Sequence, residues 1–268
     1  MKLGIGFNIF SGGELLKPAC LNARQFSDCI VVMFSPVSDS GTVAPKFIKP
    51  LLDELLKEKL IDKIIECNLG VVTNCINVQN LNRARFELGR QYCLEQGCTH
   101  FMGRDCDEFY LSEQFKQVLQ EAEDYDVLIV RILDYINNPL LRAKSPSPLH
   151  VPLLHKISNH YIPKHFPVLI DLARTVNAET FKIFSDKEIL MHHFTGVRFN
   201  KKELIRKFEG HSHFIRLGEA GVEEYLERVL YPDMKTYEVI SNDIFGVKSY
   251  WENEFKLFYE RYMNEASI

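Results

Sequence analysis

The feature that most constrains the fold is an alternation of short apolar runs with longer amphipathic segments in the first hundred residues. Residues 29–34 form an unbroken apolar run, which is typical of a strand buried on both faces of a parallel sheet. Further strands are predicted at residues 3–10, 64–67 and 99–103, with helices at residues 14–25, 46–63 and 80–96. Strands that alternate with helices in this way favour a parallel sheet covered on both faces. We therefore expect an α/β fold with a mostly parallel, Rossmann-like sheet.

The second half of the chain is less regular. Helices are predicted at residues 112–122 and 200–208, and a strand at residues 126–133. Residues 138–167 are rich in proline, and we expect a long irregular loop there that contributes to a binding pocket, because long ordered loops in compact domains are usually functional. From residue 218 onward the pattern is helical and aromatic, which predicts a C-terminal helical extension.

Composition and charge exclude several classes of protein. Of the 268 residues, 46% are hydrophobic and 25% are charged, and the formal net charge of -4 indicates no broad basic surface for nucleic acid. The seven cysteines are scattered without a CxxC pair, which is typical of reduced thiols in a cytosolic protein. The N-terminus does not resemble a signal peptide, and no apolar run approaches the roughly 20 residues that span a bilayer. We expect a cytoplasmic protein without a transmembrane segment.

Three carboxylates, Asp105, Asp107 and Glu108, directly follow the strand predicted at residues 99–103. Carboxylates this close repel one another and are costly to bury unpaired, so a cation is expected among them. A hard divalent cation takes oxygen ligands, and open α/β sheets bind ligands at the carboxyl ends of their strands. The alternative is a solvated acidic turn.

A second group of polar residues opens the helix predicted at residues 80–96. Asn82, Arg83 and Arg85 offer hydrogen-bond donors there, at the end of the helix whose macrodipole favours an anion. The alternative is an asparagine cap followed by two surface arginines.

Two pairs of histidines could bind a metal. His192 and His193 follow an apolar run, and neighbours on an extended segment point to opposite faces, so at most one of them is expected to face the acidic triplet. His211 and His213 form a second pair, but no cysteine or carboxylate spacing completes a zinc site around them. The motifs of serine hydrolases, P-loop nucleotidases and standard dinucleotide enzymes are missing from the sequence.

Three stretches, taken in order, resemble nucleotide-sugar glycosyltransferases of the GT-A fold, from the broad group related to glycosyltransferase family two. They are residues 82–89, residues 99–109 with the Asp-x-Asp motif, and residues 191–198 with the His-His pair, followed by Lys201, Lys202 and Lys207. The resemblance covers roughly residues 1–215. It implies a GT-A domain there, with a nucleotide-sugar half at about 1–110 and an acceptor half at about 111–215. Residues 216–268 would be a helical extension packed on this domain.

The resemblance implies a metal-dependent glycosyltransferase. Such an enzyme transfers a hexose or pentose from a nucleoside-diphosphate sugar, here first a UDP-sugar, to a hydroxyl of a glycan or another biopolymer. Its cation, Mn²⁺ or Mg²⁺, bridges the diphosphate of the donor. Carried over to this sequence, Asp107 is the main metal ligand, Asp105 touches the ribose or the metal, and His192 or His193 completes the coordination. The remaining residues implied at the donor are Asn82, Arg83, Arg85, Arg198 and Lys202.

Two features depart from the family's pattern. The family holds the base with an acidic residue on the second strand, whereas here that strand ends at Ser35 and Asp39 lies further along. An inverting enzyme also needs a carboxylate base beside the acceptor hydroxyl. Three carboxylates without a supporting motif are candidates for it: Asp134, Asp171 and Glu188.

Two other functions remain open. A nucleotidyltransferase or a metal-dependent phosphohydrolase also gathers carboxylates around a cation on an α/β sheet. A non-catalytic sugar-binding or protein-binding module is the other, since a fold does not guarantee an activity. The transferase releases a nucleoside diphosphate, the other enzymes release pyrophosphate or phosphate, and the module shows no metal-dependent binding of nucleotides.

Overall fold

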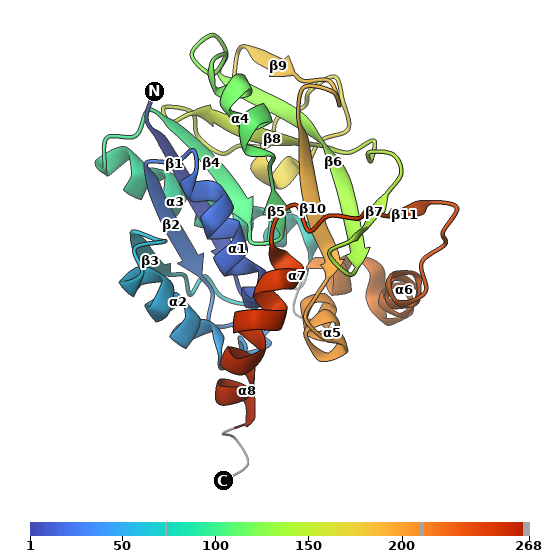
Figure 1. Ribbon diagram of the computed structural model, residues 1–268. Coiled ribbons are helices and arrows are strands. Elements are labelled where there is room, and N and C mark those ends of the chain that lie inside the picture. Colours follow the sequence, from blue (N-terminus) through green and yellow to red (C-terminus); the bar gives the residue numbers. More distant parts are fainter. Residues whose placement is uncertain (73, 210–211, 265–268) are drawn as a thin grey trace.

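The computed structural model describes residues 1–72, 74–209 and 212–264. Within these residues, eleven strands form one sheet with helices on both faces (Figure 1). The strands are β1 (Leu3–Ile9), β2 (Cys29–Phe34), β3 (Lys63–Glu66), β4 (His100–Asp105), β5 (Glu108–Phe109), β6 (Val127–Asn137), β7 (Leu141–Ala143), β8 (His150–Lys156), β9 (Phe181–Ile183), β10 (Leu190–Val197) and β11 (Tyr237–Val239). Their order along the main path is β11-β7-β6-β8-β4-β1-β2-β3.

The helices alternate with the strands in the first half and gather at the C-terminus. They are α1 (Gly13–Arg24), α2 (Ile48–Lys57), α3 (Cys75–Glu95), α4 (Ser112–Leu119), the 3₁₀ turn η1 (Leu172–Arg174), α5 (Lys201–Glu209), α6 (Ser212–Leu230), α7 (Val247–Tyr250), the π-helical turn η2 (Trp251–Phe255) and α8 (Lys256–Asn264). Among the described residues, no helix has the length and apolar character needed to cross a membrane.

The first four strands form the parallel part of the sheet. β1 pairs in parallel with both β2 and β4, and β2 pairs in parallel with β3. The predicted α/β class, with parallel strands between helices and a helical C-terminus, is confirmed. Beyond β4 the sheet is mixed, because β8 runs antiparallel to both β4 and β6.

The two faces of β1 explain how the helices are distributed. Leu3, Ile5 and Phe7 are buried in the main core, which also contains the apolar side chains of α1 and α2. The alternate positions face α3, and a Cβ atom at Gly4 would lie 2.5 Å from the Cβ atom of Cys93 on that helix. Glycine therefore lets α3 approach the strand closely.

The prediction of an irregular loop over residues 138–167 is wrong, because this stretch contains β7 and β8. β8 lies inside the sheet, between β4 and β6. Its Pro152 faces Ile129 at the point where the register between β6 and β8 shifts. A proline is tolerated inside a sheet at such an irregularity, since no regular ladder bond is lost there. The prolines concealed a strand that the apolar residues alone would have indicated.

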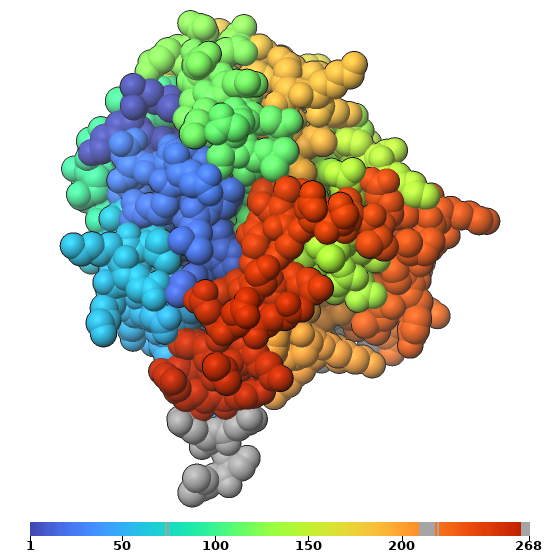
Figure 2. All heavy atoms as spheres, viewed as in Figure 1, coloured from blue at the N-terminus to red at the C-terminus, as the bar shows by residue number. Residues whose placement is uncertain are grey.

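The C-terminal segment packs beside the N-terminal helices, where the red atoms adjoin the blue ones in Figure 2. The ring of Phe255 packs 5.6 Å from that of Phe47, which precedes α2. Pro18 lies inside α1 and lacks the N–H that would bond to the carbonyl of Glu14, four residues earlier. That carbonyl accepts a hydrogen bond from Nε1 of Trp251 at 2.8 Å. A residue near the other end of the chain thus supplies the donor that the proline removes.

We expect Trp251→Phe to lower the free energy of unfolding by roughly 1–3 kcal/mol, because it leaves the buried carbonyl of Glu14 without a donor. Pro18→Ala restores the N–H that bonds to this carbonyl within the helix. Trp251→Phe should therefore lower the free energy of unfolding by less in the Pro18→Ala variant than in the wild type. Urea denaturation of the wild type, both single variants and the double variant measures this coupling. An equal loss of unfolding free energy with and without Pro18→Ala would show that the hydrogen bond from Trp251 to Glu14 does not cause the destabilisation.

Candidate active site

A cleft lies at the carboxyl ends of β1, β2 and β4, where α/β sheets bind ligands. One wall comes from these strands and the other from distant parts of the chain. The first wall contains Asn8, Ser35 and Asp105, and the second contains Arg174, His193 and Lys207. Residues separated by up to two hundred positions in the sequence therefore share one cleft.

The acidic triplet lies at the turn between β4 and β5. One carboxylate oxygen from each of Asp105, Asp107 and Glu108 lies within 4.8 Å of the others. The side chain of Asp105 is 35% exposed, whereas those of Asp107 and Glu108 are buried. The amide of Phe194 on β10 donates to the carbonyl of Asp107 at 2.7 Å and holds the turn in place. Two of the three acids are enclosed by protein, so the alternative of a solvated acidic turn does not describe the arrangement.

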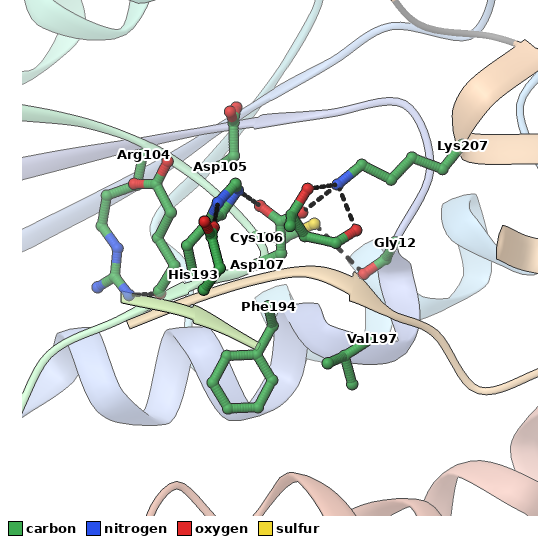
Figure 3. Close-up of polar contacts among 12 residues, drawn as sticks. Gly12, Arg104, Asp105, Cys106, Asp107, His193, Phe194, Val197 and Lys207 are labelled. Carbon is green, nitrogen blue, oxygen red and sulfur yellow. Dashed lines mark hydrogen bonds and ion pairs between the residues drawn. The ribbon is translucent and has the colours of Figure 1, made fainter. Parts of the chain in front are cut away.

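Two cations hold Asp107 in its charged form. Nζ of Lys207 and Nη2 of Arg198 both donate to Oδ2 of Asp107, at 2.8 and 2.9 Å (Figure 3 shows the lysine). Burial disfavours the charged carboxylate, but Lys207, His193 and Arg198 outweigh it and hold the pKa of Asp107 well below its usual range. The other oxygen, Oδ1, lies 3.8 Å from Nε2 of His193.

Arg174, which the sequence analysis missed, binds three carboxylates. Its Nη2 donates to Asp105 at 2.7 Å and to Oε1 of Glu108, and its Nε lies 3.2 Å from Asp171. Burial raises the pKa of Asp105 and of Glu108, and the charge of Arg174 opposes the rise. Among the described residues, the buried Oε2 atom of Glu108 has no hydrogen-bond partner. Such an atom is costly to leave unpaired, so the acidic triplet retains one oxygen without a partner.

The two neighbouring histidines point to opposite faces, as expected. His192 is buried away from the cleft, where its Nδ1 lies 2.9 Å from the hydroxyl of Tyr135 and its ring packs edge-on against Phe245. Burial lowers the pKa of His192 to about 4. His193 lines the cleft, with its Nδ1 3.0 Å from Oδ1 of Asp134. The structure thus distinguishes between the two histidines, which the sequence could not.

The acidic triplet could hold a divalent cation, because one carboxylate oxygen from each of its three side chains lies within 4.8 Å of the others. His193 lies beside this group, with its Nε2 3.8 Å from Oδ1 of Asp107. Asp134 stands behind His193 as second carboxylates do behind metal-binding histidines.

The predicted helix start at residue 80 is wrong. α3 begins at Cys75, and the side chain of Asn74 caps it by accepting from the amide of Asn77 at 2.9 Å. Asn82, Arg83 and Arg85 therefore lie well inside the helix, where the positive end of its macrodipole has no effect. The sequence misled because asparagines at positions 74, 77 and 80 all suit a cap.

Two of these three helix residues still line the cleft. Arg85 forms a two-pronged pair with Asp39 and donates to Oδ1 of Asn82 at 2.9 Å. Asp39, which follows β2 too late to match the family's pattern, thus lies in the cleft after all. Arg83 binds the carbonyl of Leu172 through Nε at 3.3 Å and Nη2 at 3.0 Å, so it positions η1 instead of facing the cleft.

Lys202 and Glu188 also lie outside the cleft. Lys202 is exposed on the first turn of α5, and the lysine that reaches the acids is Lys207, on the buried face of the same helix. Glu188 accepts from the amide and the hydroxyl of Ser185 at 2.8 and 2.7 Å in an exposed turn. The predicted pair at positions 211 and 213 falls where the structure describes no side chains.

A signal for Lys207 existed in the sequence, but none existed for Arg174. Lys207 lies on the face of α5 that also carries the buried Leu204 and Phe208, and a lysine on an apolar face needs an acidic partner. Arg174 belongs to a segment without periodicity, so its three contacts follow only from the tertiary structure.

Comparisons with known proteins find a distant likeness. No family model and no curated protein matches the sequence. The structure of S. aureus TarS 1-349 has a TM-score of 0.45 at 10% identity, over 98% of this chain and 81% of that chain. TarS 1-349 in complex with UDP-GlcNAc has a TM-score of 0.41 at 12% identity, over 98% and 82%. Another structure of S. aureus TarS has a TM-score of 0.43 at 11% identity. The match covers 72% of this chain but only 37% of that TarS chain.

We expect Asp134→Asn to lower the pKa of His193. Burial alone would lower that pKa, but the bond to Asp134 and the charge of Asp107 outweigh it and raise the pKa above its usual value. A raised pKa in the folded protein stabilises it fully below the unfolded value of about 6.5, and this contribution is lost as pH rises through the folded value.

The variant should therefore lose more unfolding free energy at about pH 6 than at about pH 9. Histidine titration by NMR and urea denaturation of the metal-free protein measure both effects. The titration of His192, on the other face, serves as the internal control. An unchanged titration of His193 would rule out the pairing with Asp134.

Proposed function

We propose that the chain is a metal-dependent glycosyltransferase. It transfers a hexose or pentose from a nucleoside-diphosphate sugar, with a UDP-sugar as the first donor to test, to a hydroxyl of a glycan or another biopolymer. The observation that carries the proposal is one cleft in which three candidate metal ligands, Asp105, Asp107 and His193, lie beside two buried cations, Arg198 and Lys207. A bound ion and fixed positive charge would both stabilise a departing diphosphate.

In this mechanism, Asp105, Asp107 through Oδ1 and His193 through Nε2 would hold the cation. When bound, the ion supplies Lewis-acid stabilisation of the departing diphosphate. Lys207 and Arg198 keep Asp107 ionised and occupy its Oδ2, which leaves Oδ1 for the ion. Since both cations are already fixed by the fold, they need no reorganisation when charge develops on the diphosphate.

We assign the nucleoside of the donor to the wall formed by Asn82, Arg85 and Asp39, whose amide, guanidinium and carboxylate groups match the polar edges of a base. Three carboxylates were considered as the catalytic base that accepts the proton of the acceptor hydroxyl. Of these, Asp171 lines the cleft, whereas Asp134 is bonded to His193. Residues 1–110 are then the nucleotide-sugar half, residues 111–215 the acceptor half and residues 216–268 the extension.

The histidine pair offers a matched test of metal binding. His193→Gln should weaken the affinity for Mn²⁺ by roughly 10-fold or more, because it removes a ligand. His192→Gln should leave that affinity unchanged, since this side chain lies on the opposite face of β10. Electron paramagnetic resonance of free Mn²⁺ measures both. Equal affinities in the two variants would exclude His193 as a ligand.

Turnover tests the proposed reaction. With Mn²⁺ and a panel of nucleoside-diphosphate sugars, Asp107→Asn should lower kcat/KM by roughly 100-fold or more, as loss of transition-state stabilisation does. Asp105→Asn provides a second variant whose more exposed side chain is less important for folding. Glu188→Gln should retain full activity, because Glu188 lies in an exposed turn.

The products decide between the candidate functions. Nucleoside diphosphate supports the transferase, whereas pyrophosphate or phosphate supports a nucleotidyltransferase or a phosphohydrolase. A thermal-shift panel with nucleotides and Mn²⁺ identifies the binding module by the lack of any metal-dependent shift. For a true donor, stabilisation of about 2.7 kcal/mol is expected at one hundred times the dissociation constant.

A further inference from the structure

Three cysteines lie together at the end of the sheet opposite the cleft. Cys29 is the first residue of β2, Cys93 lies in the last turns of α3, and Cys98 precedes β4. Their sulfur atoms all lie within 4.8 Å of one another, and those of Cys29 and Cys93 are 3.9 Å apart. All three side chains are buried. Three separate elements therefore converge on one point through their thiols.

The convergence depends on a glycine. A Cβ atom at Gly4 on β1 would lie 2.6 Å from the sulfur of Cys93 and 3.3 Å from that of Cys98. Any larger residue at this position would push α3 away from the strands and separate the sulfurs. A fourth buried cysteine of the same apolar cluster, Cys67, donates to the carbonyl of Ile65 at 3.6 Å and lies outside the group.

We propose that Cys29, Cys93 and Cys98 bind one thiophilic divalent ion, of which Zn²⁺ is the common biological example. Tetrahedral Zn–S bonds of about 2.3 Å place two sulfurs about 3.8 Å apart. The distance between the sulfurs of Cys29 and Cys93 is 3.9 Å, so these two need almost no movement. The cysteines supply three of the four tetrahedral ligand positions.

Charge balance favours a divalent ion. Binding releases three thiol protons, so one dication and three thiolates carry a net charge of about -1. A monovalent ion would leave about -2 in an apolar cluster, which is more costly. The ammonium group of Lys2 donates to the carbonyl of Gln96 at 2.5 Å, and a Cβ atom at Gly97 would lie 3.9 Å from it. This positive charge therefore lies beside the turn that leads into Cys98.

The site has a structural role. Buried cysteines can also pack as small apolar side chains, but packing alone does not require three sulfurs from three elements to meet. An ion here joins β2, β4 and α3 at the ends away from the cleft, so its removal lowers stability without changing the cleft. The inference is independent of the proposed glycosyltransferase activity.

Titration of the reduced, metal-free protein with Cd²⁺ tests the proposal. Cadmium bound to thiolates gives an ultraviolet charge-transfer band that carboxylate ligands do not give. The band should saturate at one ion per chain in the wild type and in two controls, Cys67→Ala and Asp107→Asn. Cys93→Ala and Cys98→Ser should lose it, with an affinity at least roughly 100-fold weaker.

Thermal unfolding gives a second readout. Added to the metal-free protein, Zn²⁺ should raise the Tm of the wild type and of Cys67→Ala, but not that of Cys93→Ala or Cys98→Ser. Circular dichroism establishes that each variant is folded. A wild type without the band, or a Cys93→Ala variant that keeps it at full intensity and affinity, would overturn the proposal.

Discussion

The buried carboxylate of Asp107 connects the two halves of the sheet. It follows β4, whereas its partners Arg198 and Lys207 lie 91 and 100 residues further along the chain, after β10. Removing one partner from a buried pair of this kind costs roughly 3–5 kcal/mol, because a charge is left uncompensated. Both cations use the same carboxylate oxygen, so the other oxygen is directed at His193. The interaction that stabilises the fold thereby also orients the group that we propose as a metal ligand.

The charges in the cleft form a connected network. Arg198 also lies 3.7 Å from Glu14, which is buried in α1, and burial raises the pKa of Glu14 to about 7. Arg174 links the acidic triplet to η1 in the same manner. Each cation therefore joins an acid of the N-terminal half to a later segment of the chain. Removing any one of these cations would leave its acidic partners unpaired. Because an unpaired charge is costly in low-dielectric surroundings, several elements would be disturbed together.

Local irregularities in the N-terminal half are compensated from elsewhere in the chain. Pro18 removes one hydrogen bond from α1, and Trp251 supplies a donor to the carbonyl that is left. Gly4 weakens β1 as a strand residue, yet it allows α3 to pack closely and brings the buried cysteines together. The cleft and the cysteine cluster thus occupy opposite ends of the same parallel strands, one suited to a ligand and the other to stability.

The sequence by itself determined the α/β class, the position of the acidic triplet after a strand, and the rule that only one of two adjacent histidines can face it. These follow from periodicity and from neighbouring residues, which act locally. Only the tertiary structure decided that this histidine is His193, that Lys207 reaches Asp107 in place of Lys202, and that Arg174 and Asp39 line the cleft. It also revealed β8, a strand inside the sheet that the sequence did not predict because it contains Pro152. The physical reason is that these contacts join residues far apart in the chain, and their free energy depends on burial and charge that no local pattern encodes.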